Sequence, residues 1–160
     1  MNENASEPRQ VTLQTLPDLV GTTFGPSAPI VINQQRIDSF ASVTGDTQWL
    51  HVDRERAKTG PFGTTVAHGY LTLSIGPTLL QTLFEVTDAS HVINCRVINA
   101  RFMAPVRVDS LVRLTAHVSA IDKLRNGYSV KLEATFSVDG LPSPVCRAEF
   151  VLRYDGKVPS

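Results

Sequence analysis

The sequence predicts an α+β fold in which an antiparallel β-sheet wraps around one central apolar helix. Two observations lead to this prediction. Residues 63–84 contain no Asp, Glu, Lys or Arg, and a helix that is apolar nearly all round belongs inside a protein. Three later stretches, at 112–120, 128–138 and 146–154, alternate apolar and polar residues, as strands with one buried and one wet face do.

The chain opens with a polar segment. Residues 1–10 have no apolar core of the kind found in signal peptides, so they predict a disordered tail. Residues 11–160 suit a single domain in length, and residues 11–32 predict irregular structure with a short strand or two.

The first helix is predicted to begin after Asn33. Asn is a good N-cap, and Ile32 and Ile37 are correctly spaced for a hydrophobic staple around it. Gly45 is expected to end this helix as a C′ glycine, so that Asp46 begins a loop.

Later elements follow from similar signals. A second short helix is predicted over 53–59, with Asp53 as its cap. Pro77 is expected to kink or divide the uncharged helix, because proline removes one of its hydrogen bonds. The stretch 91–103 predicts a strand whose apolar positions switch parity, which favours a bulge near Val97.

The sequence also predicts how the strands are connected and what packs against their apolar face. Asn-Gly at 126–127 and Asp-Gly at 139–140 predict hairpin turns between the last three strands. A sheet with one apolar face and a helix apolar on every side are best satisfied when the sheet wraps around the helix. That arrangement is the hot-dog fold, and because such folds usually dimerise, we expect a homodimer.

Composition narrows the classes of partner. Lys plus Arg and Asp plus Glu both number 15, so the formal net charge is zero and gives no bulk attraction to nucleic acid or anionic membranes. The uncharged segment is interrupted by Gly and Pro, which argues against a membrane span. Cys95 and Cys146 lie in apolar alternating stretches, so both are expected to be buried, reduced thiols, which indicates the cytosol.

The segment "TGDTQWLHVD" at 44–53 places Asp46 and His51 five residues apart around the single tryptophan, Trp49. Regular structure points residues at this spacing in different directions. Either Asp46 satisfies backbone donors while His51 is a surface or packed residue, or the loop curls to bring the two together. No third ligand stands nearby at metal-ligand spacing, and no G-x-S-x-G motif supplies a nucleophile, so neither a metal site nor a nucleophilic triad is expected.

The stretch "GPFGTTVAHGYLTL" at 60–73 runs from a glycine-rich loop into the start of the uncharged helix. Free N–H groups and the positive end of the helix dipole stabilise a carbonyl that develops negative charge there. Gly69 is the natural donor because it lacks a Cβ, although the glycines are also explained by tight-turn geometry alone. His68 is expected to be structural or to orient a tautomer.

Together these two segments resemble the signature of the MaoC-like, (R)-specific enoyl-CoA hydratases, the hydratase 2 family. That signature contains an aromatic residue, G-D-x-N-P-[LIV]-H and a later A-H-G at a helix start. The matching positions are Phe40, Gly45, Asp46, Leu50, His51, Ala67, His68 and Gly69. The family's Asn-Pro is replaced by Gln48-Trp49, which affects substrate preference and fine geometry more than the reaction.

The resemblance implies a reaction and roles for residues. It implies hydration of a trans-2-enoyl-CoA to the (R)-3-hydroxyacyl-CoA, with Asp46 and His51 as the catalytic pair and the Gly69 N–H as oxyanion donor. No metal or organic cofactor is implied, and coenzyme A enters as part of the substrate. The candidate substrate contacts are Gln48, Trp49, Phe62, Gly63 and His68.

Two other functions are weighed against this one. A hot-dog thioesterase typically needs a carboxylate on the central helix, and residues 69–84 contain none. A non-catalytic, acyl-thioester-binding subunit of a dehydratase heterodimer would be expected to lack Asp46 or His51, and both are present.

Overall fold

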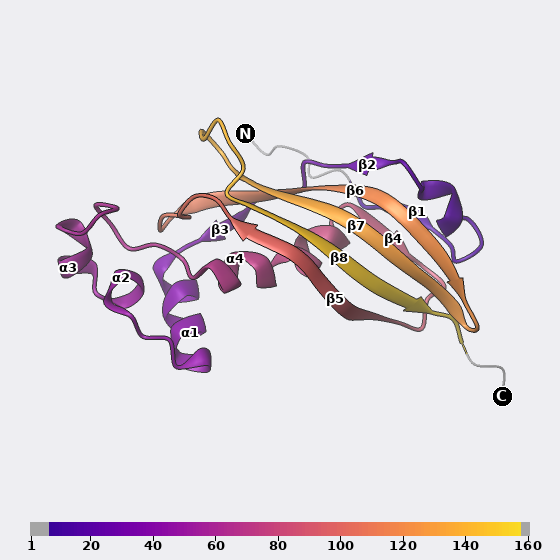
Figure 1. Ribbon diagram of the computed structural model, residues 1–160, viewed down its shortest axis with the longest axis horizontal. Helices are drawn as coiled ribbons and strands as arrows, with labels where there is room; N and C mark the ends of the chain where they lie inside the picture. The colour runs from indigo at the N-terminus through magenta and orange to yellow at the C-terminus, as the bar shows by residue number, and fades with distance from the viewer. Residues whose placement is uncertain (1–6, 158–160) are drawn as a thin grey trace.

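The computed structural model describes residues 7–157 and confirms the α+β prediction: a curved antiparallel sheet wraps around a central helix (Figure 1). The strands lie in the order β2-β6-β7-β8-β5, and β3 also pairs with β6. Their bounds are β2 (Thr23–Phe24), β3 (Ile30–Ile32), β5 (His91–Phe102), β6 (Ser110–Leu124), β7 (Gly127–Val138) and β8 (Cys146–Asp155).

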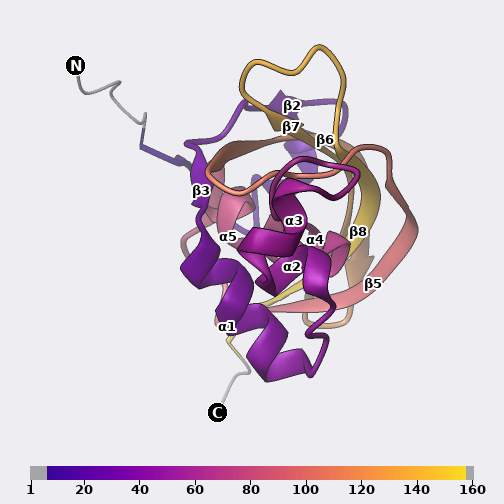
Figure 2. The same ribbon diagram turned by 90° about the vertical axis from the view of Figure 1, so that its left-hand side faces the viewer.

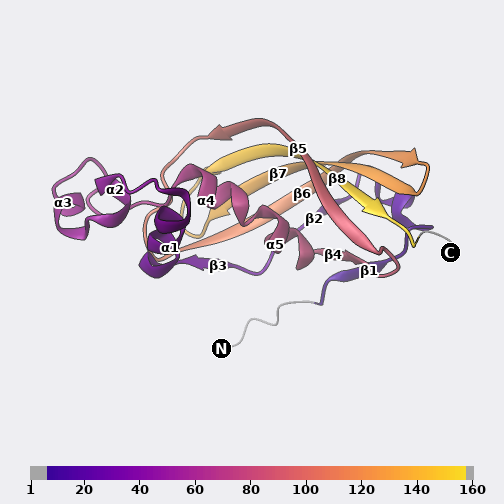
Figure 3. The same cartoon turned by 90° about the horizontal axis from the view of Figure 1, so that it is seen from below.

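Helical segments occupy the concave face and both ends of this sheet (Figure 1). They are η1 (Leu16–Leu19), α1 (Gln34–Thr44), α2 (Trp49–Val52), α3 (Arg54–Lys58), α4 (Gly69–Ser74) and α5 (Gly76–Gln81). Seen from below, α4 and α5 run beneath the sheet (Figure 3), and the end view shows α1, α2 and α3 gathered in front of it (Figure 2). No helix among residues 7–157 is long and apolar enough to cross a membrane.

The alternation predicted for the long strands is present in the core. Val112, Leu114, Ala116 and Val118 of β6 are all fully buried, while the residues between them are partly exposed. Burying a side chain of this kind contributes roughly 1.5–3 kcal/mol, so the inner face of the sheet is a major source of stability.

The central helix is divided where Pro77 predicted. α4 ends at Ser74, α5 begins at Gly76, and Pro77 lies in the first turn of α5, where its missing N–H costs nothing. A Cβ added to Gly76 would stand 2.9 Å from the Phe150 ring and 3.1 Å from the Phe136 ring. Gly76 therefore allows the helix to lie close against the sheet.

The edge strand β5 matches its prediction only in part. The irregularity expected near Val97 is confirmed: Val97 itself pairs with Phe150, and register shifts lie on both sides of it. One shift falls at Cys95 and the other at 99–100, where Asn99 has a φ of 52°. Nearly the whole strand is exposed, including Cys95, so the predicted burial of both thiols holds for Cys146 alone.

The two predicted hairpin turns also differ in detail. Between β6 and β7, Leu124 pairs with Gly127, so the connecting residues are Arg125 and Asn126 rather than Asn-Gly. The connection from β7 to β8 is not a tight hairpin but runs over 139–145. It includes Pro142 and Pro144, which cannot donate to a strand ladder, so β8 begins only after them.

The N-terminal prediction is partly wrong. β1 (Arg9–Val11) pairs in parallel with β4 (Phe84–Val86), so Arg9 and Gln10 are not a disordered tail. Arg9 N–H donates to the Leu83 carbonyl, and burial of Val11 explains why the segment docks. Residues 1–6 lie outside the described residues.

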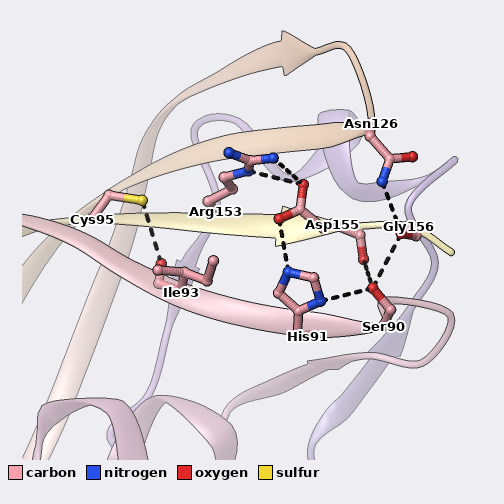
Figure 4. Close-up of polar contacts among 8 residues, drawn as sticks. All are labelled: Ser90, His91, Ile93, Cys95, Asn126, Arg153, Asp155 and Gly156. Carbon is pink, nitrogen blue, oxygen red and sulfur yellow. Dashed lines mark hydrogen bonds and ion pairs between the residues drawn. The ribbon is translucent and has the colours of Figure 1, made fainter. Parts of the chain in front are cut away.

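A polar cluster fastens the start of β5 to the end of β8 (Figure 4). The buried Asp155 carboxylate accepts hydrogen bonds from Arg153 and lies 3.0 Å from His91 Nε2. Ser90 Oγ lies 3.0 Å from His91 Nδ1 and donates toward the carbonyls of Asp155 and Gly156. Because two backbone carbonyls compete for the one hydroxyl proton of Ser90, this Ser-His-Asp arrangement is better explained as a structural contact between β5 and β8 than as a nucleophilic triad.

Candidate active site

Asp46 is positioned by the end of α1. Asn33 caps the start of this helix by accepting from Arg36 N–H, as predicted, and Gly45 ends it with a φ of 77°. The left-handed turn at Gly45 releases the chain so that Asp46 leaves the helix with its side chain 57 % exposed.

His51 lies in a helical turn, not in the loop that the sequence predicted. The turn is α2, which begins three residues after Asp46. Because a helical turn advances less along the chain than an extended loop does, His51 stays close to that carboxylate. The imidazole is buried, with an exposed fraction of 7 %. Its Nδ1 lies 2.6 Å from the Val66 carbonyl, and since a carbonyl only accepts, Nδ1 carries the proton and Nε2 carries the lone pair.

His68 joins the two groups. Its ring stacks on the His51 ring with centroids 3.7 Å apart, and its Nε2 lies 2.8 Å from the backbone carbonyl of Asp46. The ring is buried, and its Nδ1 has no hydrogen-bond partner among the described residues. His68 thus fixes the backbone of the acid and one face of the neighbouring imidazole, in keeping with the orienting role expected for it.

The fold supplies a third potential metal ligand that the sequence did not reveal. One ligand atom each from Asp46, His51 and His68 lie within 4.8 Å of one another. The two imidazole rings are stacked in nearly parallel planes, at 23° with centroids 3.7 Å apart, so in-plane lone pairs on the two rings do not converge on one point, and His68 Nε2 already faces a carbonyl. A first coordination shell needs converging ligands, so the geometry suits proton transfer better than metal binding.

The environment of His51 keeps it neutral. Burial lowers the pKa of the imidazole below its ordinary 6.5. The hydrogen bond to Val66 opposes this, the neighbouring His68 lowers the pKa further, and Asp46 raises it. Burial outweighs the opposing contributions, so near pH 7 His51 has an unprotonated Nε2 that can act as a base.

This environment predicts the pH dependence of activity and stability. Because the folded-state pKa of His51 lies below 6.5, activity that needs the neutral ring should persist above that pH and fall on an acid limb below it. Protonation of His51 favours the unfolded chain, so its contribution to stability is also lost as pH falls below 6.5.

Rate profiles of kcat/KM and urea unfolding between about pH 4.5 and 8.5 measure both effects. An acid limb with its midpoint above 6.5 would contradict the assignment. Replacement of His51 by Gln should abolish the corresponding part of the pH dependence of stability.

Gly69 stands at the first position of α4, where the backbone N–H has no acceptor within the helix. A Cβ at this position would meet the Phe102 ring at 3.1 Å, so a larger residue would fit only if that ring moved by a few tenths of an ångström. Gly69, Phe62 and Phe102 line a cavity of about 270 Å³. Gly69 thus borders a space that a small ligand group can enter, and its N–H has no hydrogen-bond partner among residues 7–157.

The other candidate substrate contacts are less directly placed. Phe62 lines the cavity with Gly69, but Gln48 and Trp49 do not, and Gly63 occupies a turn with a φ of 70°. Trp49 packs elsewhere: the Arg56 guanidinium lies 4.4 Å from its ring, and a Cβ on Gly60 would meet that ring at 2.9 Å. Trp49 therefore packs against α3 and the Gly60 turn.

Sequence reasoning missed three residues around this site. Gln34 and Thr65 are buried and hydrogen-bonded behind His51, and Phe102 covers Gly69 from β5. Gln34 is a polar residue in the first turn of a helix, and a polar residue there gives no sign that it is buried.

Comparison with known proteins identifies the family. The MaoC-like domain model matches residues 15–138, more than half of the chain. The chain belongs to the MaoC-like domain family. It is 40 % identical over 147 residues to 3-hydroxyacyl-thioester dehydratase Z of Mycobacterium tuberculosis, which covers 89 % of this chain and 97 % of that protein.

A further curated relative and a solved structure are also similar to the chain. An (R)-specific enoyl-CoA hydratase of Rhodospirillum rubrum is 31 % identical over 90 residues, covering 56 % of this chain and 60 % of that one. The structure of the (R)-hydratase from A. caviae superposes with a TM-score of 0.69 at 22 % identity, over 88 % of this chain and 96 % of that one, which confirms the hot-dog fold. Because its curated relatives are named a dehydratase and an enoyl-CoA hydratase, the MaoC-like chain is a hydro-lyase.

Proposed function

We propose that this MaoC-like protein hydrates trans-2-enoyl-CoA reversibly to (R)-3-hydroxyacyl-CoA. The observation that carries the proposal is the pairing of a buried neutral imidazole, His51, with the exposed carboxylate of Asp46, within 4.8 Å of each other. The relatives named dehydratase and enoyl-CoA hydratase support a thioester substrate.

In the proposed reaction a water molecule is held between Asp46 and His51. His51 Nε2 removes a proton as the water oxygen bonds to C3 of the enoyl group. The electron pair of the C2–C3 double bond moves toward the thioester carbonyl. The proton passes from His51 to the Asp46 carboxylate, and the Asp46 carboxyl then gives it to C2 on the same face, so addition is syn and both side chains return to their starting charge.

The Gly69 N–H is proposed to donate to the thioester oxygen while enolate character develops. A preorganised donor of this kind contributes roughly 3 kcal/mol to the stabilisation of the transition state. The reaction needs neither a metal ion nor an organic cofactor in this scheme, because the acid–base pair and the backbone donor supply all of its chemistry.

The acyl chain is proposed to lie along the uncharged central helix. One cavity lies beside Gly69, and a second, of about 520 Å³, lies at the far end of α5. The second cavity is lined mainly by apolar side chains, including Leu80 and Leu152, and by Tyr154. Two cavities near the two ends of the central helix, both lined mainly by apolar side chains, suit a hydrocarbon chain.

Purified protein with crotonyl-CoA tests the proposal. Hydration removes the conjugated double bond, so the enone absorbance should fall without release of free thiol. Release of coenzyme A thiol with the enone intact would indicate a thioesterase instead. Absence of both signals would indicate the non-catalytic binding subunit, and either result would overturn the hydratase proposal.

The edge strand β5 is the proposed surface for homodimerisation. Ile93 and Val97 are 44 % and 46 % exposed, on a strand whose outer edge has no partner among the described residues. An exposed edge with apolar side chains is a template for pairing with a second chain. Association of two copies along this edge would bury these side chains.

We therefore expect Ile93→Glu and Val97→Glu to shift the protein from dimer to monomer in sedimentation or light-scattering measurements. Val43→Glu is the matched control, because Val43 is 87 % exposed on α1, away from β5. A wild-type monomer, or a dimer unaffected by either β5 substitution, would contradict this interface.

A further inference from the structure

Gln34 forms a fully satisfied buried contact behind the candidate site. It lies in the first turn of α1 with an exposed fraction of 5 %. Its Nε2 donates to the backbone carbonyl of His51 and to Asp38 Oδ1, each at 2.7 Å. Its Oε1 accepts from the hydroxyl of Thr65 at 2.5 Å. Both acceptors facing Nε2 can only accept, so the orientation of the amide is fixed by chemistry.

These contacts close a ring around His51. Gln34 holds the backbone carbonyl of His51, while His51 Nδ1–H donates to the carbonyl of Val66. Thr65, the residue before Val66, is 1 % exposed and returns to Gln34 through its hydroxyl. The ring of contacts therefore joins the main chain of His51 to the segment whose carbonyl accepts the hydrogen bond of its Nδ1–H.

The segment carrying Val66 is itself anchored on both sides. Val66 N–H donates to the Leu50 carbonyl at 3.1 Å, and Val66 forms a bridge with Arg107. The Val66 carbonyl is consequently a fixed acceptor, and the position of His51 relative to it is set by Gln34 and Thr65. A shift of either element would release Nδ1–H from its acceptor.

We propose that Gln34 and Thr65 are positioning residues for His51, holding its ring in the Nδ1–H tautomer with Nε2 toward Asp46. This inference rests on the proposed hydratase function, because it assigns a purpose to the orientation of the proposed base. The pair acts through His51 and touches no reacting atom. Removing a side chain that orients the histidine ligand of a metal site typically costs about 10–100-fold in activity, and we expect an effect of that order for this positioning pair.

Three charged or titratable side chains face the contacts that Gln34, Thr65 and His51 form. Asp38 faces the Gln34 amide from the next turn of α1, and Asp46 and His68 face the His51 ring from the other side. A carboxylate in place of the Gln34 amide would meet both Asp38 and a carbonyl oxygen, so Gln34→Glu removes two donors and adds repulsion at nearly constant shape.

The test compares isosteric variants with neighbouring controls. Thr65→Val removes the hydroxyl and Thr65→Ser retains it; Thr64→Val is the control, since Thr64 shows no side-chain hydrogen bond in residues 7–157. Gln34→Glu is paired with Gln35→Glu, because Gln35 is exposed on the same helical turn. Measured quantities are kcat and KM for crotonyl-CoA, their pH profiles, and the tautomer of His51 by long-range ¹H–¹⁵N NMR.

We expect Thr65→Val and Gln34→Glu to lower kcat by about 10–100-fold with little change in KM, and to populate the Nε2–H tautomer. Thr65→Ser should restore both readouts, and the two controls should behave as wild type. A loss of thermal stability with unchanged kcat, pH profile and tautomer would show that the pair is merely structural and would overturn the proposal. So would a Thr65→Ser variant as impaired as Thr65→Val.

The tautomer measurement separates this proposal from the proposed function. If the wild type does not hydrate crotonyl-CoA but the variants change the His51 tautomer, the hydratase function fails while the positioning role stands. If the wild type hydrates the substrate and the variants change neither rate nor tautomer, the positioning role fails alone.

Discussion

Replacing Asp46 by Asn or His51 by Ala is expected to reduce kcat/KM for crotonyl-CoA by about 10²–10⁴-fold each, with the fold retained. The magnitude follows from the loss of one general acid–base group from the proposed pair. Asp46→Asn preserves shape and removes the carboxylate, and Asp46 is exposed enough that its loss should change stability little. His51→Ala removes the neutral Nε2 and leaves the Val66 carbonyl without its donor.

Controls keep this prediction specific to the pair. Asp122→Asn and His117→Ala change the same residue types on β6 and should leave activity unchanged. Because the two proposed residues act on one water, the double variant should be hardly worse than the poorer single variant. Full activity in both single variants would remove the basis for the hydratase assignment.

Gly127→Ala is expected to destabilise the protein by more than about 3 kcal/mol in urea unfolding experiments. Gly127 has a φ of 147°, a conformation that side chains disfavour, at the start of β7. A Cβ there would stand 1.9 Å from the Tyr154 carbonyl oxygen, which belongs to the paired backbone of β8. The strands would have to separate, because backbone atoms on both sides leave no side chain to rotate away.

Gly140→Ala is the matched control for the clash. Gly140 also has a positive φ, 84°, but a Cβ at that position would meet no atom within 4 Å. Its substitution carries the conformational cost alone, about 1–2 kcal/mol. If the two substitutions cost the same, the close approach of β8 to Gly127 is not rigid and the prediction is wrong.

Local patterns predicted most of the fold because they depend on neighbours in the chain. The cap at Asn33, the stop at Gly45 and the division of the helix near Pro77 are all present as expected. The alternation in β6 predicted which face is buried. Where partners were distant in sequence, prediction failed: docking of Arg9–Val11 on β4 and the exposure of Cys95 depend on tertiary contacts.

The same division holds at the candidate site. The motif identified Asp46, His51 and Gly69, but it placed His51 in a loop, whereas a helical turn carries it. The stacking of His68 on His51 and the contacts of Gln34 and Thr65 join segments 17 to 31 residues apart. No local pattern indicates such contacts, because the sequence around a polar residue is the same whether its side chain faces solvent or a buried partner.

The class of fold, the position of the central helix and the residues available for acid–base chemistry follow from the amino-acid sequence. Hydrophobic periodicity, capping and the spacing of the motif act within a few residues, so a single sequence reveals them. Which nitrogen of His51 carries the proton, and the lowering of its pKa, follow from the folded structure. Those properties depend on Val66, on His68 and on burial, which exist only after the chain has closed around the site.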